Sequence, residues 1–255
     1  MPTVSSVKEQ MARLVFACCA AAALSTAFAF GGEPDDVPPG FQSLVPGSDL
    51  AGWAGGSTAD PRTIKPERQA AWDSQIAQHW WVDGEELVSD GHGPHLVTNK
   101  KYRDFELWVD WKLSPTGDSG VYLRDTPQVQ LWDPTNEAAH KHGADRGSCG
   151  LWNNRGPGKW PLVLADKPTG EWNRTYIRMV GPYVRVVLNE QPVVEDAVLE
   201  NYFDRNSPVF DEGRIHLQTH GSETRFRRLL VRGIPQAEAA SLRQAIEDAA
   251  KPSAE

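Results

Sequence analysis

The segment Gln128-Val-Gln-Leu-Trp-Asp133 alternates polar and apolar side chains. In an extended strand this period of two places Gln128, Gln130 and Trp132 on one face. Enzymes that cleave glycosides by the ordinary route need two carboxylates, about 5–5.5 Å apart for retention or about 6.5–9.5 Å apart for inversion. Amides stand here where those carboxylates are required. The segment can therefore hydrogen-bond a polar ligand, but it argues against a two-carboxylate glycosidase.

Close histidine pairs occur at His92-Gly-Pro-His95 and His140-Lys-His142. Neither pair has the spacing of a zinc site and both lie in loop-like sequence, so we interpret them as solvated loop histidines. Cys149 has no thiolate partner at metal-ligand spacing, and we expect a buried small residue there. No cofactor is assigned. A divalent cation such as calcium, held by backbone and carboxylate oxygens, leaves almost no sequence trace and stays open.

Short β-strands must position these side chains. Residues 105–113 alternate apolar and polar side chains, which predicts a half-buried strand. Residues 114–118 (Ser-Pro-Thr-Gly-Asp) predict the turn that ends this strand, and Gly181-Pro182 predicts a second turn. Further strands are predicted over residues 119–124, 128–132, 174–180, 183–188, 213–219 and 225–231.

Strands this short, separated by frequent turn signals, predict an all-β fold, a β-sandwich or jelly roll, over residues 41–234. The 22 Gly and 19 Pro supply the turns such a fold needs. Residues 30–40 are predicted to be a flexible lead-in. Residues 55–79 are polar and mildly helical at 67–78, which indicates a surface insertion. Residues 235–255 are rich in Ala and Glu and predict a short peripheral helical tail.

The charge balance restricts the partners. A formal net charge of −8 over 255 residues argues against a nucleic-acid or anionic-membrane partner, because binding to phosphate groups requires clustered Lys and Arg. Neutral sugars place no such demand on charge. The 10 Trp residues are compatible with aromatic platforms for sugar rings.

The N-terminus has the organisation of a secretory signal peptide. Lys8 and Arg13 precede an apolar run over residues 14–24, and Ala27-Phe28-Ala29 forms an A-x-A cleavage site. The run is shorter than the about 20 apolar residues that span a bilayer. We expect residues 1–29 to be removed and the protein to be exported, to the periplasm or the cell exterior. A lipoprotein, with Cys18 or Cys19 lipidated, is the weaker interpretation.

Seven phrases, in the same order and covering about residues 41–234, resemble the 3-keto-disaccharide hydrolase domain family of exported bacterial proteins. They are residues 80–87 (WWVDGEEL), 102–107 (YRDFEL), 119–124 (SGVYLR), 129–133 (VQLWD), 150–154 (GLWNN), 167–173 (KPTGEWN) and 217–221 (LQTHG), the last followed by Phe226-Arg227.

The resemblance implies a concanavalin-A-like β-sandwich whose concave face binds a sugar. It also implies action on glycosides oxidised at C3, which a separate sugar 3-dehydrogenase would supply. This chain departs from the family at two positions. Relatives often carry Glu where Gln128 stands, so no carboxylate role is carried over, and many have Gly where Cys149 stands, which indicates a tight backbone site.

A 3-keto sugar needs one base, because the ketone acidifies the proton on C2 and the C1 substituent can leave by elimination. We expect His220 as the base, since histidine titrates near 6.5. Asp133 would orient it, act as the acid or hold a cation. The remaining predicted substrate-binding residues are Arg124 and Gln130 as donors to the enolate oxygen or ring hydroxyls, Asn153 and Gln218 as further hydrogen-bonding partners, and Trp132 and Trp152 as stacking platforms.

Each of these side chains has an ordinary structural interpretation. His220 could cap a turn before Gly221, Asp133 could initiate a turn before Pro134, and Arg124 could form an edge-strand salt bridge. Other assignments are equally open: Trp132 and Trp152 as core residues, Asn153 as a turn residue, and Gln218 as an exposed residue on the face of His216.

Two functions of different classes therefore remain. The first is an exported enzyme that cleaves 3-keto-glycosides by elimination or hydrolysis. The second is a non-catalytic carbohydrate-binding module of the same fold, which would show an aromatic row and no titratable group in its binding site. A structural or surface-interaction protein is a weaker third. The sugar, its linkage and the oligomeric state leave no signal in the sequence.

Overall fold

A computed structural model describes residues 37–45 and 47–251. The predicted signal peptide, with Cys18 and Cys19, and most of the predicted lead-in lie outside the described residues. No helix within the described part of the chain is long and apolar enough to cross a membrane.

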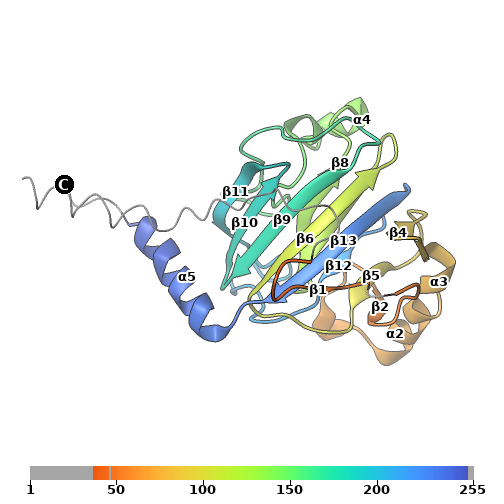
Figure 1. The fold of residues 1–255 in the computed structure, drawn as a ribbon, viewed down its shortest axis with the longest axis horizontal. Coiled ribbons are helices and arrows are strands. Elements are labelled where there is room, and N and C mark those ends of the chain that lie inside the picture. Colours follow the sequence, from red (N-terminus) through yellow and green to blue (C-terminus); the bar gives the residue numbers. More distant parts are fainter. Residues whose placement is uncertain (1–36, 46, 252–255) are drawn as a thin grey trace, which may run out of the picture. The chain divides into compact units, whose positions relative to one another are not determined.

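The larger of two antiparallel sheets is built around β6, and Figure 1 shows its long strands side by side. Within the described residues its order is β11-β10-β9-β6-β13-β4-β3, with β1 paired to β13. The strands are β1 (Gln42–Ser43), β3 (Trp80–Asp83), β4 (Glu86–Ser89), β6 (Phe105–Leu113), β9 (Asn173–Val180), β10 (Tyr183–Leu188), β11 (Gln191–Val198) and β13 (Thr224–Gly233).

The smaller sheet has the order β2-β5-β12-β7-β8 within the described residues. Its strands are β2 (Trp53–Gly56), β5 (His95–Thr98), β7 (Asp118–Leu123), β8 (Thr126–Trp132) and β12 (His216–Leu217). Apolar side chains of both sheets form one shared core, which includes Trp111 from β6, Val121 from β7 and Leu131 from β8. The predicted all-β sandwich is therefore confirmed.

Strand β6 has the predicted bounds but is not half-buried, because its outer face is covered as well. Asp110 on that face accepts two hydrogen bonds from Arg174, at 2.9 and 3.0 Å. Glu106 accepts one from the hydroxyl of Tyr176 at 2.6 Å. Carboxylates are buried where they are paired and hydrogen-bonded, so alternating polarity does not mean exposure in this strand.

Helices lie in the two segments where the sequence predicts them. The polar segment 55–79 holds the 3-10 turn η1 (Pro61–Thr63) and the helices α2 (Pro66–Asp73) and α3 (Ile76–His79). The tail forms α5 (Gln236–Ala249), where Ala239 and Leu242 contact Val180 and Ile234. Two further short elements, α4 (Glu137–His140) and η2 (Ala144–Arg146), lie between β8 and β9.

Candidate active site

A cavity of about 270 Å³ lies on the face of the smaller sheet that points away from the core. Side chains alternate across each strand, so Val121, Leu131 and their neighbours face the core while the residues between them face the cavity. The floor consists of Asp118 and Tyr122 from β7, Gln128, Gln130 and Trp132 from β8, and Gln218 and His220 beyond β12. Helix α4 contributes Ala139 to the walls, and loops contribute Thr58, His142, Trp152, Asn153 and Tyr202.

The register between β12 and β7 places the titratable pair of the cavity. His216 pairs with Tyr122 across the two strands, and Gln218 N–H donates to the carbonyl of Gly120 at 2.9 Å. Continuing this register brings His220 opposite Asp118. The His220 Nδ1 atom lies 3.2 Å from Asp118 Oδ2.

Asp118 is the only carboxylate among the described residues that line the cavity. Its hydrogen bond to His220 raises the pKa of that imidazole above its usual value, against the opposing effect of burial. If Nδ1 carries the proton directed at Asp118, Nε2 keeps its lone pair and can accept a proton. His220, the predicted base, thus lines the cavity, whereas its partner Asp118 was not predicted from the sequence.

Gln130 holds Asp118 in place rather than facing a ligand with free donors. Its Nε2 donates to Asp118 Oδ1 at 2.7 Å and to the carbonyl of Ser119 at 3.0 Å. Its Oε1 accepts a hydrogen bond from Gln128 Nε2. Both amide hydrogens of Gln130 are therefore occupied, and its role in this structure is to orient the carboxylate.

Gln218 lines the cavity, and its side chain carries a buried, unsatisfied acceptor. Its side chain is 9% exposed, and its Oε1 has no hydrogen-bond partner. A buried polar atom without a partner costs free energy, so this oxygen is ready to accept a donor from a ligand. A Cβ on Gly120 would lie 2.9 Å from Gln218 Oε1 and 3.0 Å from Gln128 Cδ. Glycine at 120 thus allows both amides to lie on the floor.

A buried histidine pair, His95 and His216, lies beside Tyr122 on the same face of the smaller sheet as the cavity, and it corrects the interpretation of His95 as a solvated loop histidine. His95 is 7% exposed on β5, and its ring meets Tyr122 edge to face at 5.3 Å. Tyr122 stacks on His216 at 5.2 Å, so His216 and Gln218 do not share an exposed face. Burial lowers the pKa of His95 to about 3. Burial also raises the pKa of Tyr122 to about 12, against the opposing effect of its hydrogen bond to Thr58.

Asp125 supports this histidine pair from the β7–β8 turn. Its Oδ1 lies 2.8 Å from His216 Nε2 and 3.0 Å from Arg214 Nε. Burial opposes ionisation of Asp125, but the His216 and Arg214 contacts keep the pKa of its carboxyl below the usual range. His216 and Asp125 are buried, so the cluster holds the ring of Tyr122 in place from the side.

The structure does not bring Asp133 to the cavity. Its carboxylate accepts hydrogen bonds from the hydroxyls of Thr135 and Thr169, both at 2.7 Å, and from the backbone N–H of Thr116 at 2.9 Å. Burial works against ionisation, yet these donors together hold the pKa of Asp133 below its usual range. We therefore replace Asp133 by Asp118 as the partner of His220.

Arg124 also lies outside the cavity lining. It belongs to the two-residue turn between β7 and β8, where Arg124 and Asp125 have φ of 53° and 59°. Its guanidinium is buried and donates to Asp104 Oδ1 at 3.0 Å and to the carbonyl of Phe210 at 3.2 Å. The alternation with Tyr122 expected for an extended strand ends at this turn, so Arg124 points elsewhere.

The two predicted tryptophans line the cavity with different exposure. Trp132 is 4% exposed and donates from Nε1 to the carbonyl of Gly147 at 2.8 Å, so it is a buried part of the floor. Trp152 lies in a loop, half-buried, and meets Trp132 edge to face at 6.3 Å. Asn153 follows it at the cavity wall, where a substrate contact was predicted.

Cys149 is fully buried, as expected, and has φ of 72°, a backbone conformation that favours glycine. Burial raises the pKa of its thiol. Over residues 37–45 and 47–251, no three His, Cys, Asp or Glu side chains gather closely enough to hold a metal ion.

Comparison with known proteins identifies the family of this chain. The family model of the 3-keto-alpha-glucoside-1,2-lyase-like domain matches residues 40–232. A 3-keto-disaccharide hydrolase of Bacteroides thetaiotaomicron is 25% identical over 237 residues, covering 76% of this chain and 78% of that protein.

Two crystal structures from Parabacteroides distasonis ATCC 8503, each described as a candidate glycosyl hydrolase, have TM-scores of 0.53 and 0.56 to this chain. Their identities are 22% and 20%, and they cover 77% and 76% of this chain and 94% and 99% of their own. This likeness supports the fold. Because the family model spans most of the sequence, the chain belongs to the family of 3-keto-alpha-glucoside-1,2-lyase-like domains.

Proposed function

We propose that this protein cleaves 3-keto-glycosides by base-catalysed elimination, with His220 as the base and Asp118 as its partner. The observation that carries the proposal is the His220–Asp118 contact of 3.2 Å at the wall of a polar cavity. Family membership supports a glycoside-cleaving enzyme of the hydrolase type, and the substrate and route are our inference from the site.

The single titratable pair matches what a 3-keto sugar requires. Nε2 of His220 takes the proton from C2, and the C–H electrons form the enolate with the C3 oxygen. The ketone re-forms as the C1–O bond breaks, which leaves a C1–C2 double bond. The departing oxygen takes a proton and leaves as an alcohol. Addition of water across the double bond would make the net reaction a hydrolysis.

The amide floor suits the neutral and anionic states of such a substrate. Gln128 uses one amide hydrogen on Gln130, and its second hydrogen can be directed at a ligand oxygen. A donor aimed at the C3 oxygen stabilises the enolate in a site from which water is partly excluded. The free Oε1 of Gln218 accepts a hydroxyl of the same ring.

The site also favours an enzyme over a binding module. A module that only binds sugar needs aromatic platforms and hydrogen-bonding groups but no acid–base pair in its cavity. Here His220 has a raised pKa, and its partner carboxylate is itself held by Gln130. A hydrogen bond such as that from Gln130 to Asp118 fixes the orientation of the acid–base pair. A protein that only binds sugar does not require this.

The substrate class implies a partner reaction and a location. A 3-keto-glycoside must be supplied by oxidation of the C3 hydroxyl, so we propose a functional link to a sugar 3-dehydrogenase. The signal-peptide pattern puts both reactions outside the cytoplasm in this proposal. Fractionation of the host cells tests this location. Mass measurement of the N-terminus tests the processing, because the mature protein should lack residues 1–29.

The decisive experiment incubates the purified protein with 3-keto-trehalose and with a 3-keto-β-glucoside, and follows products by mass spectrometry. Release of 3-keto-glucose or its unsaturated 2-hydroxy-glycal form supports the proposal, and a parallel sample with EDTA reports on a cation. His220→Ala should lower the turnover by about 10²–10⁴-fold, the usual contribution of a general base, while the fold is kept. Binding of unoxidised sugar without any product would favour the binding module.

A further inference from the structure

The mouth of the cavity carries two aromatic side chains that the reaction itself does not use. Tyr202 and Trp152 come from different loops, 199–215 and 152–159, and both line the cavity. Tyr202 is 40% exposed, although a large ring at a protein surface usually gains from burial. Its position at the rim of a polar cavity therefore needs an explanation.

Polarity and exposure change together from floor to mouth. The amides of Gln128 and Gln130 on the floor are 5% and 3% exposed. The base must contact C2, so the oxidised ring has to lie over this floor. The oxidised ring then occupies the buried floor of the cavity of about 270 Å³, and the exposed ring of Tyr202 marks the mouth. The group attached at C1 must then extend to the mouth.

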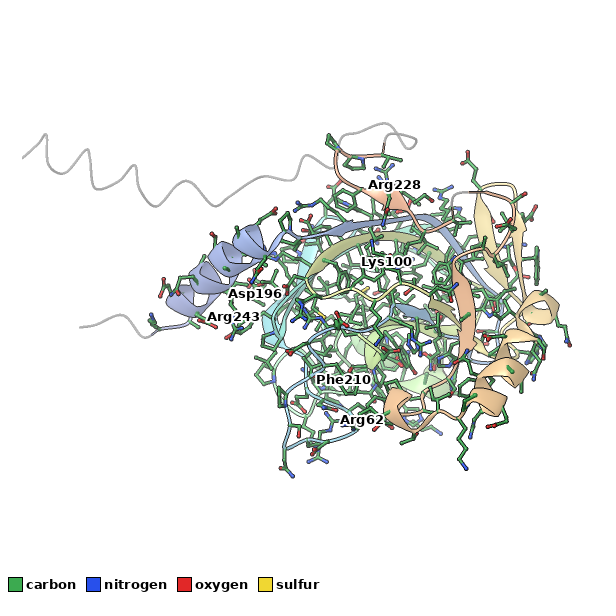
Figure 2. All side chains as sticks on the ribbon, turned by 90° about the horizontal axis from the view of Figure 1, so that it is seen from below. Arg62, Lys100, Asp196, Phe210, Arg228 and Arg243 are labelled. Carbon is green, nitrogen blue, oxygen red and sulfur yellow. The ribbon has the colours of Figure 1, made fainter. Side chains whose placement is uncertain are left out.

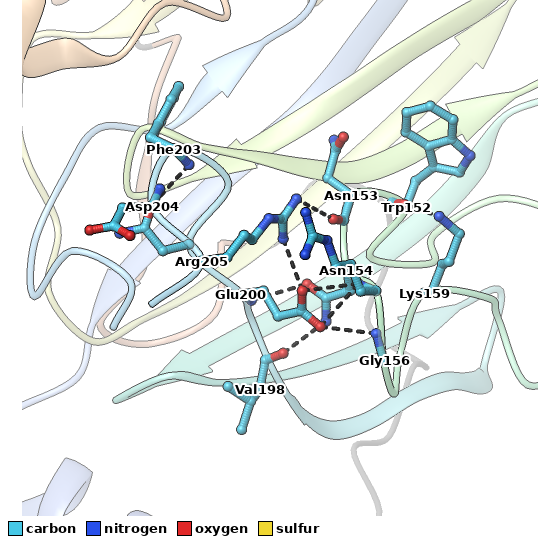
Figure 3. A network of polar contacts seen from close by, with 12 residues as sticks. Trp152, Asn153, Asn154, Gly156, Lys159, Val198, Glu200, Phe203, Asp204 and Arg205 are labelled. Atoms are coloured by element: carbon cyan, nitrogen blue, oxygen red, sulfur yellow. Dashed lines mark hydrogen bonds and ion pairs between the residues drawn. The ribbon is translucent and has the colours of Figure 1, made fainter. Parts of the chain in front are cut away.

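A network of hydrogen bonds around Arg205 and Glu200 joins the two loops at the mouth, as Figure 3 shows. Arg205 donates to Glu200 Oε2 at 2.9 Å and to the backbone carbonyl of Asn153 at 2.8 Å. Glu200 in turn accepts from the backbone N–H of Arg155 and of Gly156, at 3.0 and 2.9 Å. One guanidinium therefore fixes the backbone of a cavity residue in the opposite loop.

Arg205 also fixes the aromatic ring of its own loop. Its Cζ lies 5.5 Å from the centroid of the Tyr202 ring, a cation–π contact. Phe203 meets Tyr202 edge to face at 5.3 Å and stacks on Phe210 at 6.1 Å. Arg62 comes from the segment 55–79, and its Cζ lies 5.2 Å from the centroid of the Phe210 ring. Figure 2 shows these two side chains together. Tyr202 is thus held in place although it is exposed.

We propose that Tyr202 and Trp152 form the subsite for the leaving group, and that Arg205 is the positioning residue of this subsite. The ligand class is a sugar ring or an aromatic aglycone, whose flat apolar face packs on an aromatic ring. This rests on the proposed function, because it assigns the two ends of the same cavity to the two parts of one substrate.

The test compares methyl and phenyl 3-keto-glucosides of the same anomeric configuration. Tyr202→Ala should raise KM for the phenyl glycoside about tenfold, which corresponds to about 1.4 kcal/mol, and change KM for the methyl glycoside by less than about twofold. Tyr202→Phe keeps the ring and should behave as the wild type. Trp81→Ala is the matched control, because Trp81 is also 40% exposed but does not line the cavity.

Arg205→Lys tests positioning separately from folding. Lysine keeps the charge beside Glu200 but lacks the planar fork that reaches two acceptors at once. We expect the ratio of the phenyl to the methyl KM to rise, whereas a purely structural defect would change both constants together. Equal effects on both glycosides, or no effect of Tyr202→Ala on either, would overturn the subsite.

The proposal can be judged even if the protein turns over neither compound, which would instead refute the proposed function. Calorimetry then compares binding of unoxidised phenyl and methyl glucosides to the wild type and to Tyr202→Ala. A preference for phenyl that disappears in the variant supports the aromatic subsite. Equal affinities in the wild type refute it.

Discussion

Asp118→Asn is the substitution that separates the proposed base from its environment. In the wild type His220 Nδ1 faces Asp118 Oδ2 at 3.2 Å, and this contact raises the pKa of the imidazole. The neutral base is the active form, so kcat/KM should rise with pH through a pKa above 6.5. Removing the carboxylate charge moves this rise toward lower pH.

The size of the shift follows from the exposure of the pair. The side chains of His220 and Asp118 are 60% and 34% exposed, so solvent screens their attraction to about 0.2–1 kcal/mol. An attraction of this size predicts a small shift of the midpoint toward lower pH. The substitution should also lower kcat/KM, by about 10²-fold or more. The introduced asparagine would direct its amide N–H at Nδ1 of His220, which places the imidazole proton on Nε2, the atom that must act as base.

The assay is the pH dependence of kcat/KM on one 3-keto-glucoside, for wild type and variant. His142 also lines the cavity, so His142→Gln is the control and should leave the midpoint of the rise unchanged. A variant of Asp118 that keeps the wild-type midpoint and more than about a tenth of the wild-type rate would refute His220 as the base. A midpoint that moves with His142 would give the role to that residue.

Two further predictions concern the floor. Buried His95 stays neutral with a pKa of about 3, while the unfolded chain takes up a proton below about 6.5, so stability should fall by about 2 kcal/mol between pH 6.5 and 5 on account of this residue. His95→Gln should remove that part of the pH dependence, measured as the difference between urea unfolding at pH 7 and pH 5; an undiminished difference contradicts the assignment. Gly120→Ala should displace the amides of Gln128 and Gln218, which raises KM with a melting temperature within a few degrees of the wild type, and a large loss of stability with unchanged KM would show that the glycine serves only packing.

Period-two alternation predicts a strand only where one face is polar. It located β6 and most of β8, because their outward positions carry charged or amide side chains. It missed β5, where all four residues from His95 to Thr98 are buried and no alternation exists. Strand β12 is the reverse case, since seven residues were predicted at 213–219 and only His216–Leu217 pair. The isolated bridge from Gly213 to Tyr102 lies outside the strand.

Six of the cavity residues could be predicted individually, but the pairing of His220 with Asp118 could not. His220, Gln130, Gln218, Trp132, Trp152 and Asn153 were all expected, and all line the cavity. Asp118 was not, because its contact with His220 depends on the register between β7 and β12, which are far apart in sequence. The residues of two strands do not by themselves fix the register in which the strands pair. The same limit explains the wrong prediction for Asp133. It follows the alternating segment of β8, which suits a site residue, but the chain enters a loop there and Asp133 does not line the cavity.

The electrostatics of the floor explain why one carboxylate is enough for this site. His95 and Tyr122 have pKa values of about 3 and about 12, so neither changes charge near neutral pH. The neighbouring glutamines are neutral at every pH, and a second carboxylate in their place would stabilise the protonated imidazole and lower the fraction of neutral base at neutral pH. An ordinary glycoside would be left uncleaved by so few charged groups. A substrate whose own ketone acidifies the C2 proton needs no more than the His220–Asp118 pair and amide donors around it.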